Sequence, residues 1–256
     1  KIKFVYSDLT EESSLIKSLE NCKSFINSSS LAFGVTPFII NACKKTNIKR
    51  VVFISTTSIF TSLNVKSKKV RLKSEQLINV SHLDWTILRP TMIFGFKGDR
   101  NMIRLIKWID KFPIIPIIGD GEYLQQPVNV KDVAWAAVNV LFHPSTIQNS
   151  FNISGAKSYS FNKIIDLTAL ALRKKIYKLH LPLYLSMPFF KFFEVLKIKI
   201  PIKSEQIKRI NEHKNFSFAA AYKNFNYQPL EFFESIKIEV AEYKRLRTNP
   251  DRYTKF

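Results

Sequence analysis

Two strand-like segments separated by an amphipathic helix place the strongest constraint on the fold. Residues 50–55, Arg-Val-Val-Phe-Ile-Ser, and residues 85–88, Trp-Thr-Ile-Leu, are largely apolar runs of strand length. Such runs are typical of parallel strands that are buried on both faces of a sheet. A charged helical pattern covers residues 68–80 between them, and this order of strand, helix and strand predicts a parallel α/β sheet.

The second strand runs into a loop that contains proline and glycine. Pro90 fixes φ and lacks an N–H, so the strand ends there, and Gly95 permits backbone conformations that other residues resist. Ligands of α/β sheets bind beyond the carboxyl ends of the strands. Residues 83–95 are therefore either a ligand-binding strand end or an ordinary strand and turn, and spacing alone does not decide between them.

Composition narrows the class of protein. The chain has 256 residues, of which 46% are hydrophobic, so one large domain or slightly more is expected. Cys22, Cys43 and four scattered histidines form neither a disulfide framework nor a metal-ligand pattern, which predicts a reducing compartment and no metal. No apolar run reaches the roughly 18 to 20 residues of a spanning helix, and no signal peptide opens the sequence, which favours a cytoplasmic location.

The net charge of +20 raises the question of a nucleic-acid partner. The lysines are spread over the whole chain, and lysine, isoleucine, asparagine and phenylalanine are abundant together. No basic motif with interleaved aromatic residues appears, so we expect a general compositional drift and no nucleic-acid binding.

Several segments, taken in their order along the chain, resemble the extended, atypical branch of the short-chain dehydrogenase/reductase family, which includes NAD-dependent nucleotide-sugar epimerases and dehydratases. The matching segments are residues 6–10, 48–57, 83–95, 119–133, 151–155 and 227–230. The resemblance implies a Rossmann-like doubly wound parallel sheet with a smaller, mostly helical C-terminal lobe. It assigns residues 1–100 to an NAD(P)-binding domain, to which residues 125–155 return, and residues 101–256 to a mixed substrate-binding lobe.

The family's glycine-rich loop, which holds the cofactor pyrophosphate, is absent from this sequence. None of the six glycines precedes Gly34, and residues 2–6 look like a strand that is already under way. We therefore expect an N-terminal fragment, from which about 50 to 60 upstream residues are missing. As given, the chain is expected to bind a dinucleotide poorly.

The family's catalytic pair is a tyrosine four residues before a lysine, and the lysine lowers the pKa of the tyrosine. Lys73 matches the lysine, but Lys69 stands at the tyrosine position. Thr56 matches the family's catalytic serine or threonine. The resemblance thus implies catalytic roles for Thr56 and Lys73; a strand-end cap and a solvated helix lysine are the alternatives.

The resemblance also assigns binding residues. Contacts to the cofactor, NAD or NADP, are implied for Asp8, Leu9, Asn27, Ser28, Pro90, Thr91 and Met92. Contacts to the substrate, a nucleotide-sugar or a similar polar metabolite, are implied for Arg100, Asn101, Tyr123, Gln125 and Gln126. Arg100 suits a phosphate, although an ordinary solvated arginine is equally compatible with the sequence.

Three functions remain open. The first is an NAD(P)-dependent oxidoreductase or epimerase/dehydratase, and the second is a non-catalytic NAD(P)-binding accessory subunit, like those of respiratory complexes. The third is a peripheral membrane protein that uses the aromatic and lysine-rich residues 179–200, which otherwise belong to a lobe that covers the active site. A homodimer is compatible with each.

Overall fold

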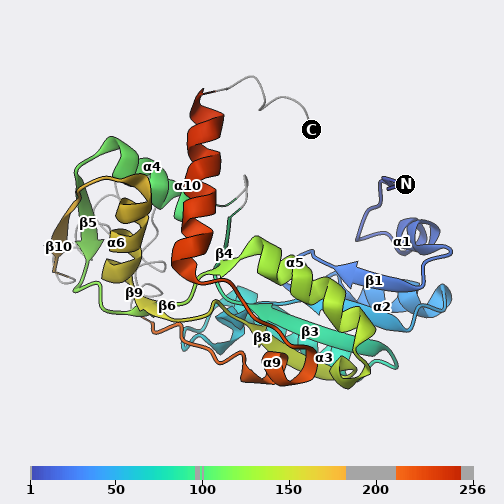
Figure 1. Cartoon of the computed structure of the whole chain (residues 1–256). Coiled ribbons are helices and arrows are strands. Elements are labelled where there is room, and N and C mark those ends of the chain that lie inside the picture. Colours follow the sequence, from blue (N-terminus) through green and yellow to red (C-terminus); the bar gives the residue numbers. More distant parts are fainter. Residues whose placement is uncertain (1, 96–98, 100, 183–211, 249–256) are drawn as a thin grey trace, which may run out of the picture. The chain divides into compact units, whose positions relative to one another are not determined.

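The computed structural model describes residues 2–95, 99, 101–182 and 212–248 (Figure 1). The chain divides into two compact units. Unit 1 consists of Lys1–Thr91, Val133–Ile153 and Ser217–Gln228, and unit 2 consists of Met92–Asp132, Ser154–Phe216 and Pro229–Phe256. Each unit thus combines segments that are distant in the sequence. The domain boundary at residue 100 and the return over residues 125–155, which the resemblance implies, stay a prediction.

Unit 1 is built on a parallel sheet of β1 (Ser24–Asn27), β2 (Arg50–Ile54), β3 (Asp84–Pro90) and β8 (Asn149–Ile153), in the order β1-β2-β3-β8. Every neighbouring pair is parallel, and Val51 lies between Phe25 and Trp85 in register. The predicted parallel α/β fold class is confirmed. Because all four strands run the same way, their carboxyl ends lie on one edge.

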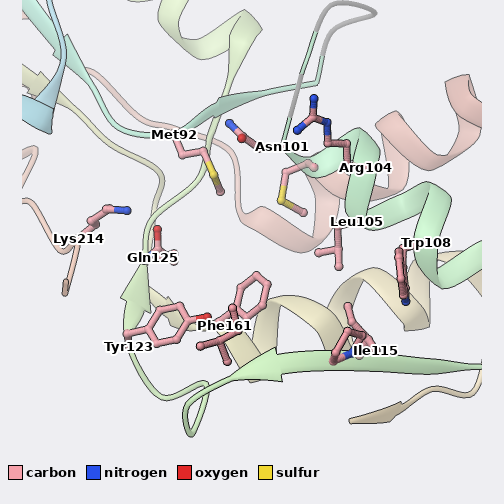
Figure 2. A pocket seen from close by; sticks show the side chains of 13 residues that line it. Met92, Asn101, Arg104, Leu105, Trp108, Ile115, Tyr123, Gln125, Phe161 and Lys214 are labelled. Atoms are coloured by element: carbon pink, nitrogen blue, oxygen red, sulfur yellow. The ribbon is translucent and has the colours of Figure 1, made fainter. Parts of the chain in front are cut away.

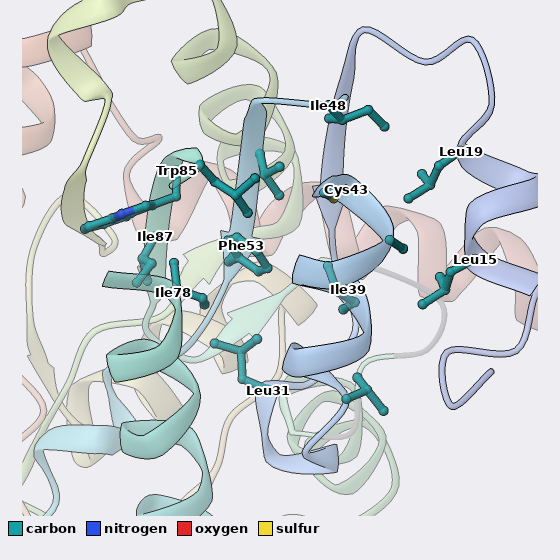
Figure 3. Close-up of a cluster of buried hydrophobic side chains, with 14 residues drawn as sticks. Leu15, Leu19, Leu31, Ile39, Cys43, Ile48, Phe53, Ile78, Trp85 and Ile87 are labelled. Carbon is teal, nitrogen blue, oxygen red and sulfur yellow. The ribbon is translucent and has the colours of Figure 1, made fainter. Parts of the chain in front are cut away.

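One face of this sheet packs against an apolar cluster that is formed with α1 (Glu12–Leu19), η1 (Leu31–Phe33), α2 (Thr36–Lys45) and α3 (Lys66–Asn79). Figure 3 shows Phe53 and Ile87 of the strands pointing toward Ile39, Ile78 and Leu31. Successive strand residues point to opposite faces. The other face accordingly meets the η3 (Val140–Phe142) and η4 (Pro144–Thr146) turns, where the Thr86 hydroxyl donates to the Thr146 carbonyl at 2.7 Å.

The remaining elements of unit 1 are η2 (Thr57–Phe60), most of α5 (Val130–Asn139) and α9 (Ala219–Phe225). Residues 2–6, which alternate like a strand, form no strand in the structure, and the side chains of Ile2, Phe4 and Tyr6 are exposed. The reason is that the alternation needs a neighbouring strand to satisfy its N–H and C=O groups, and β-structure forms only where such a partner lies alongside.

Unit 2 has a separate core between α4 (Met102–Lys111), α6 (Phe161–Leu172) and α10 (Phe232–Thr248). A parallel pair, β5 (Ile114–Ile118) and β10 (Tyr177–Leu181), flanks these helices. Two short strands follow β5 along the chain, β6 (Leu124–Gln125) and β7 (Val128–Asn129). They pair with β9 (Tyr159–Ser160) and β4 (Ile93–Phe94), respectively, because Pro127 interrupts the ladder.

A buried carboxylate ties helix α3 to the sheet of unit 1. Glu75 accepts hydrogen bonds from the Ser55 hydroxyl at 2.6 Å and from two guanidinium nitrogens of Arg89, Nη2 at 2.6 Å and Nε at 3.2 Å. The Glu75 side chain is 6% exposed and that of Arg89 19%. This two-pronged pair fixes α3 against the ends of both β2 and β3.

We expect Glu75→Gln to lower the free energy of unfolding by about 3 kcal/mol, because it removes the negative charge opposite Arg89 and replaces one acceptor oxygen with an NH2 donor that faces the guanidinium or the Ser55 hydroxyl. Glu234→Gln is the matched control, since Glu234 forms an exposed pair with Lys237, and surface pairs contribute about 0 to 1 kcal/mol. Urea unfolding of both variants measures the difference. Equal losses in the free energy of unfolding for the two variants would show that the Glu75–Arg89 pair does not fix α3 to the sheet.

A second carboxyl group makes the stability of the protein depend on pH. Burial, with a contribution from the neighbouring Asp99, raises the pKa of Glu239 on α10 from 4.5 to about 8. Between these two values the unfolded chain is ionised at Glu239 and the folded chain is not, so stability falls as pH rises from 4.5 to 8. We expect the Tm of wild type to fall over pH 5–8 relative to that of Glu239→Gln. A constant difference in Tm over this range would refute the assignment.

Candidate functional site

The residues predicted to contact a dinucleotide include those that follow β1, on the carboxyl edge of unit 1. Asn27 ends the strand, and its buried Oδ1 accepts hydrogen bonds from the Ser29 hydroxyl at 2.6 Å and from the Ser29 N–H at 3.2 Å. This ring closes a tight turn, and Ser28 lies exposed at its tip. The turn thus presents a hydroxyl at the end of the strand, while the Asn27 side chain holds the backbone in place.

Asp8 and Leu9 precede α1 in the same unit. The exposed Asp8 carboxylate accepts hydrogen bonds from the Thr10 hydroxyl at 2.7 Å and from the Thr10 N–H at 2.8 Å. These bonds lower the pKa of Asp8, which is therefore ionised at neutral pH. Leu9 packs against the apolar cluster. Of the two, Asp8 carries the polar group that a ligand hydroxyl can reach.

Thr56, Pro90 and Thr91 follow or end two paired strands, β2 and β3, and so lie on one edge of the sheet. The Thr56 hydroxyl accepts the Ser58 N–H at 3.2 Å and caps η2. This bond uses a lone pair of the oxygen, and the O–H is still able to donate. Next to it, the Thr57 hydroxyl donates to the Pro90 carbonyl at 3.3 Å, which links the two strand ends.

Lys69 and Lys73 lie one turn apart on α3, and both are exposed. The buried face of this helix carries Ser74, Glu75 and Ile78 instead. Two cations at this spacing repel each other, whereas a tyrosine and a lysine would form a hydrogen-bonding pair. The structure therefore provides no tyrosine beside Lys73 on this helix.

A cavity of about 480 Å³ lies wholly within unit 2 (Figure 2). Its walls come from α4, β5, the start of α6 and the segment around β6. Tyr123 stacks on Phe161 in this wall, with ring centroids 5.6 Å apart and planes 18° from parallel. The other apolar side chains that the figure labels in the wall are Met92, Leu105, Trp108 and Ile115.

Three of the predicted substrate residues, Asn101, Tyr123 and Gln125, are brought together in this cavity. Met92, predicted to contact the cofactor, also lines it and belongs to unit 2, whereas Pro90 and Thr91 belong to unit 1. Arg100 lies outside the described residues. The role of each residue stays a prediction.

The polar side chains in the cavity wall divide by burial. Gln125 is 7% exposed, and its Nε2 is buried without a hydrogen-bond partner among the described residues. Arg104 is exposed, and Lys214 is half-buried. Burial raises the pKa of Tyr123 above its usual range, so its phenol stays neutral at physiological pH. No aspartate or glutamate lines the cavity within the described part of the chain.

Gln126 does not line the cavity, because its amide joins three backbone segments of unit 2. Its Nε2 donates to the Gly155 carbonyl at 2.7 Å and to the Ser154 hydroxyl at 3.1 Å, and its Oε1 accepts the Phe216 N–H at 2.8 Å. The backbone at Gly155 also lies close to that of Pro127, since a Cβ added at Gly155 would lie 2.0 Å from the Pro127 carbonyl oxygen. The amide is thus used for structure.

Sequence reasoning missed Glu75, Arg89 and Arg104. A glutamate on the apolar face of a helix and an arginine inside an apolar strand are the available signals for the first two. Arg104 lies within the repeating apolar positions 102, 106 and 109 of α4, which offered no sign that it faces a cavity.

The membrane hypothesis rests mainly on residues outside the description. Of residues 179–200, the structure describes 179–182, where Leu179 and Leu181 on β10 are exposed. Among the described residues no helix is both long and apolar enough to cross a membrane. Nor do three histidine, cysteine or acidic side chains gather into a possible metal site in that part of the chain.

The parallel sheet and its polar carboxyl edge define a Rossmann-like α/β protein. The chain belongs to the NAD(P)H-binding family, whose model matches residues 1–144. The family and fold inferred from sequence resemblance are therefore confirmed.

Two relatives from Arabidopsis thaliana are similar in sequence. One is the mitochondrial NADH dehydrogenase [ubiquinone] 1 alpha subcomplex subunit 9, 26% identical over 165 residues, which is 62% of this chain and 41% of that protein. The other is the chloroplast stem-loop binding protein of 41 kDa b, 31% identical over 107 residues, which is 40% of this chain and 28% of that protein. The chain thus matches less than half of either relative's length.

Solved structures share the fold at low sequence identity. An epimerase from Methanothermobacter thermautotrophicus superposes with a TM-score of 0.77 at 13% identity, over 99% of this chain and 82% of that one. A UDP-glucuronic acid 4-epimerase from Bacillus cereus, in complex with UDP-glucuronic acid and NAD, gives 0.73 at 19% identity, over 94% and 81%. These likenesses establish the fold.

The two adjacent glutamines provide a matched pair of variants. We expect Gln126→Leu to destabilise the protein by about 2 to 4 kcal/mol, because the Phe216 N–H and the Gly155 carbonyl lose their partner. Gln125→Leu should change stability by less than about 1 kcal/mol, since its Nε2 has no hydrogen bond to lose. Chemical denaturation measures both values. If Gln125→Leu destabilises the protein more than Gln126→Leu does, the structural role assigned to the Gln126 amide is wrong.

Proposed function

We propose that the protein is an NAD(P)-dependent oxidoreductase or epimerase of the atypical, tyrosine-lacking type. The observation that carries the proposal is the carboxyl edge of unit 1, where Ser28, Thr56 and Thr91 follow three adjacent parallel strands. In α/β sheets this edge is where nucleotide cofactors bind. Membership of a family described as NAD(P)H-binding supports the same assignment.

The residues that the resemblance assigns to the cofactor in unit 1 offer groups for two parts of a dinucleotide. Asp8 offers an ionised acceptor for ribose hydroxyls, and Pro90 and Thr91 supply a fixed backbone and a hydroxyl for the nicotinamide end. The pyrophosphate is less well served, because residues 2–33 contain no glycine and so provide no glycine-rich turn. Bound NAD(P) supplies hydride transfer. Asn27 shapes the turn that carries Ser28.

Within the proposal, the Thr56 hydroxyl donates a hydrogen bond to a substrate oxygen, and the Lys73 cation stabilises negative charge on it. Substrate binding is proposed for the cavity of unit 2, through Asn101, Tyr123 and Gln125. A nucleotide-sugar is the substrate that the resemblance implies. The wall around these residues is mainly apolar.

A second function is a non-catalytic NAD(P)-binding subunit. It is favoured by the exposed Lys69 at the tyrosine position and by the similarity to a subunit of mitochondrial NADH dehydrogenase. This alternative requires cofactor binding but no turnover. Both functions therefore predict cofactor binding, and a turnover assay distinguishes between them.

We expect the protein to bind NADPH or NADH weakly in a fluorescence titration, because it has no glycine-rich turn for the pyrophosphate. Thr56→Val and Lys73→Gln should each lower kcat at least tenfold with little change in cofactor affinity. The reason is that both side chains act on the substrate oxygen and not on the cofactor. Lys66→Gln, an exposed lysine of the same helix, is the control and should leave kcat unchanged.

Binding of neither cofactor would exclude both functions. Binding without turnover on carbonyl, hydroxyl and sugar-nucleotide substrates would favour the accessory subunit. Turnover that survives both substitutions would show that other residues carry the chemistry.

A further inference from the structure

Apolar side chains gather on one side of the cavity in unit 2. We call these four residues the apolar side: Leu105, Trp108, Ile115 and Phe161. Figure 2 shows Gln125 on the opposite side of the cavity from Leu105 and Trp108. An apolar ligand group gains from each contact that it makes with the apolar side, because that contact removes apolar surface from water. The cavity thus favours a ligand that is apolar over most of its length.

Gln125 contributes a buried amide to the wall. The residue is 7% exposed, and its Nε2 forms no hydrogen bond with the described residues. Because no such bond fixes Nε2, the amide is able to turn about its last side-chain torsion, and a half-turn exchanges its NH2 and C=O groups. It can therefore present a donor or an acceptor to a ligand. A ligand group that bonds to the amide removes the cost of a buried polar group without a partner.

The fully buried residues of the described wall carry no charge. Tyr123 is one of them, and burial raises the pKa of its phenol, which stays neutral. Arg104 is exposed to water, and the half-buried Lys214 already has an interaction of its own within the chain. An ionic ligand group would lose its hydration in the cavity without gaining a buried counter-charge. We therefore expect an uncharged ligand.

The number of buried polar groups limits the ligand further. Gln125 and Tyr123 are the fully buried polar residues that line the described wall. A sugar carries a hydroxyl on almost every carbon, and each hydroxyl needs a hydrogen-bond partner once it is buried. A ligand with a single oxygen, in contrast, is satisfied by the Gln125 amide alone.

We propose that this cavity binds an uncharged, mainly apolar molecule that carries one carbonyl or hydroxyl group, with that group hydrogen-bonded to the Gln125 amide and the rest of the molecule against the apolar side. An amide donates to a carbonyl and accepts from a hydroxyl, so both members of a ketone–alcohol pair fit. The volume of about 480 Å³ lies within the range of small-molecule sites.

The inference names a substrate class for the proposed function, and it departs from the nucleotide-sugar that the resemblance implies. It rests on the proposed function only in treating the ligand as a substrate, since binding itself requires no cofactor.

Equilibrium dialysis of the full chain tests the assignment with four probes that share one ring system and one site of substitution: acetylnaphthalene, naphthylethanol, ethylnaphthalene and naphthoate. UDP-glucose is the fifth probe. We expect acetylnaphthalene and naphthylethanol to bind saturably, with one molecule per chain and affinities within about threefold of each other, because the amide serves both. Naphthoate and UDP-glucose should bind at least about tenfold more weakly than acetylnaphthalene, because their charges and hydroxyls lack buried partners.

Two cavity variants separate recognition of the oxygen from burial of the ring. Gln125→Leu should weaken acetylnaphthalene and naphthylethanol about threefold to tenfold without weakening ethylnaphthalene, which has no oxygen. Leu105→Gln, at a half-buried position of the apolar side, should weaken all three neutral probes at least about fivefold. Gln76→Leu is the control, since Gln76 is exposed on α3 of unit 1, and it should change none of the affinities.

The outcomes also separate this inference from the proposed function. NADPH binding without binding of acetylnaphthalene or naphthylethanol would overturn the ligand class and leave the oxidoreductase intact. Binding of these two probes without NADPH or NADH binding would do the reverse. Tighter binding of naphthoate or UDP-glucose than of acetylnaphthalene, or an equal loss of affinity for all three neutral probes in Gln125→Leu, would also overturn the inference.

Discussion

Parallel pairing of four strands is the constraint on which unit 1 depends. It directs the carboxyl ends of β1, β2, β3 and β8 to one edge, and it requires a crossover between successive strands that covers a face of the sheet. Both faces are therefore buried, which is why Val51, Val52 and Phe53 of β2 are all apolar. The same geometry leaves the edge as the place where polar side chains can gather. The Glu75–Arg89 pair then fixes α3 to two of these strand ends.

The sequence predicted the sheet of unit 1 because each of its strands is indicated by that strand's own residues. An apolar run gives β2, and Pro90 gives the end of β3, without knowledge of any distant residue. The sequence could not predict the pairing of β5 with β10, because the two strands are far apart along the chain and β10 is mostly exposed. Residues 2–6 show the converse: the alternation is present, but a strand needs a partner that the pattern cannot supply.

The residues of the candidate site also differ in whether local sequence can place them. Thr56 and Thr91 come directly after predicted strands, so topology alone places them on the edge. The cavity of unit 2 needs side chains from α4, β5 and α6 to meet, and only the resemblance pointed to Asn101, Tyr123 and Gln125. Gln125 and Gln126 show why the sequence cannot assign the role of each residue. They are the same residue at adjacent positions and are equally buried, yet only the Gln126 amide is fully engaged, because neighbouring residues face different surroundings.

The separation of the two units bears on which chemistry is open to the protein. The described wall of the unit 2 cavity holds cations, amides and a phenol whose raised pKa keeps it neutral, and it holds no carboxylate. None of these groups is a base that accepts a proton at neutral pH, and the proposed function accordingly gives this cavity a role in binding only. The proposed function assigns proton transfer to Thr56 and Lys73 of unit 1, where Lys69 stands at the position that the resemblance gives to a tyrosine. Dehydration needs both an acid and a base at the reacting carbons, whereas reduction of a carbonyl needs a single proton donor. Within the proposed function, simple oxidoreduction is therefore the reaction to test first.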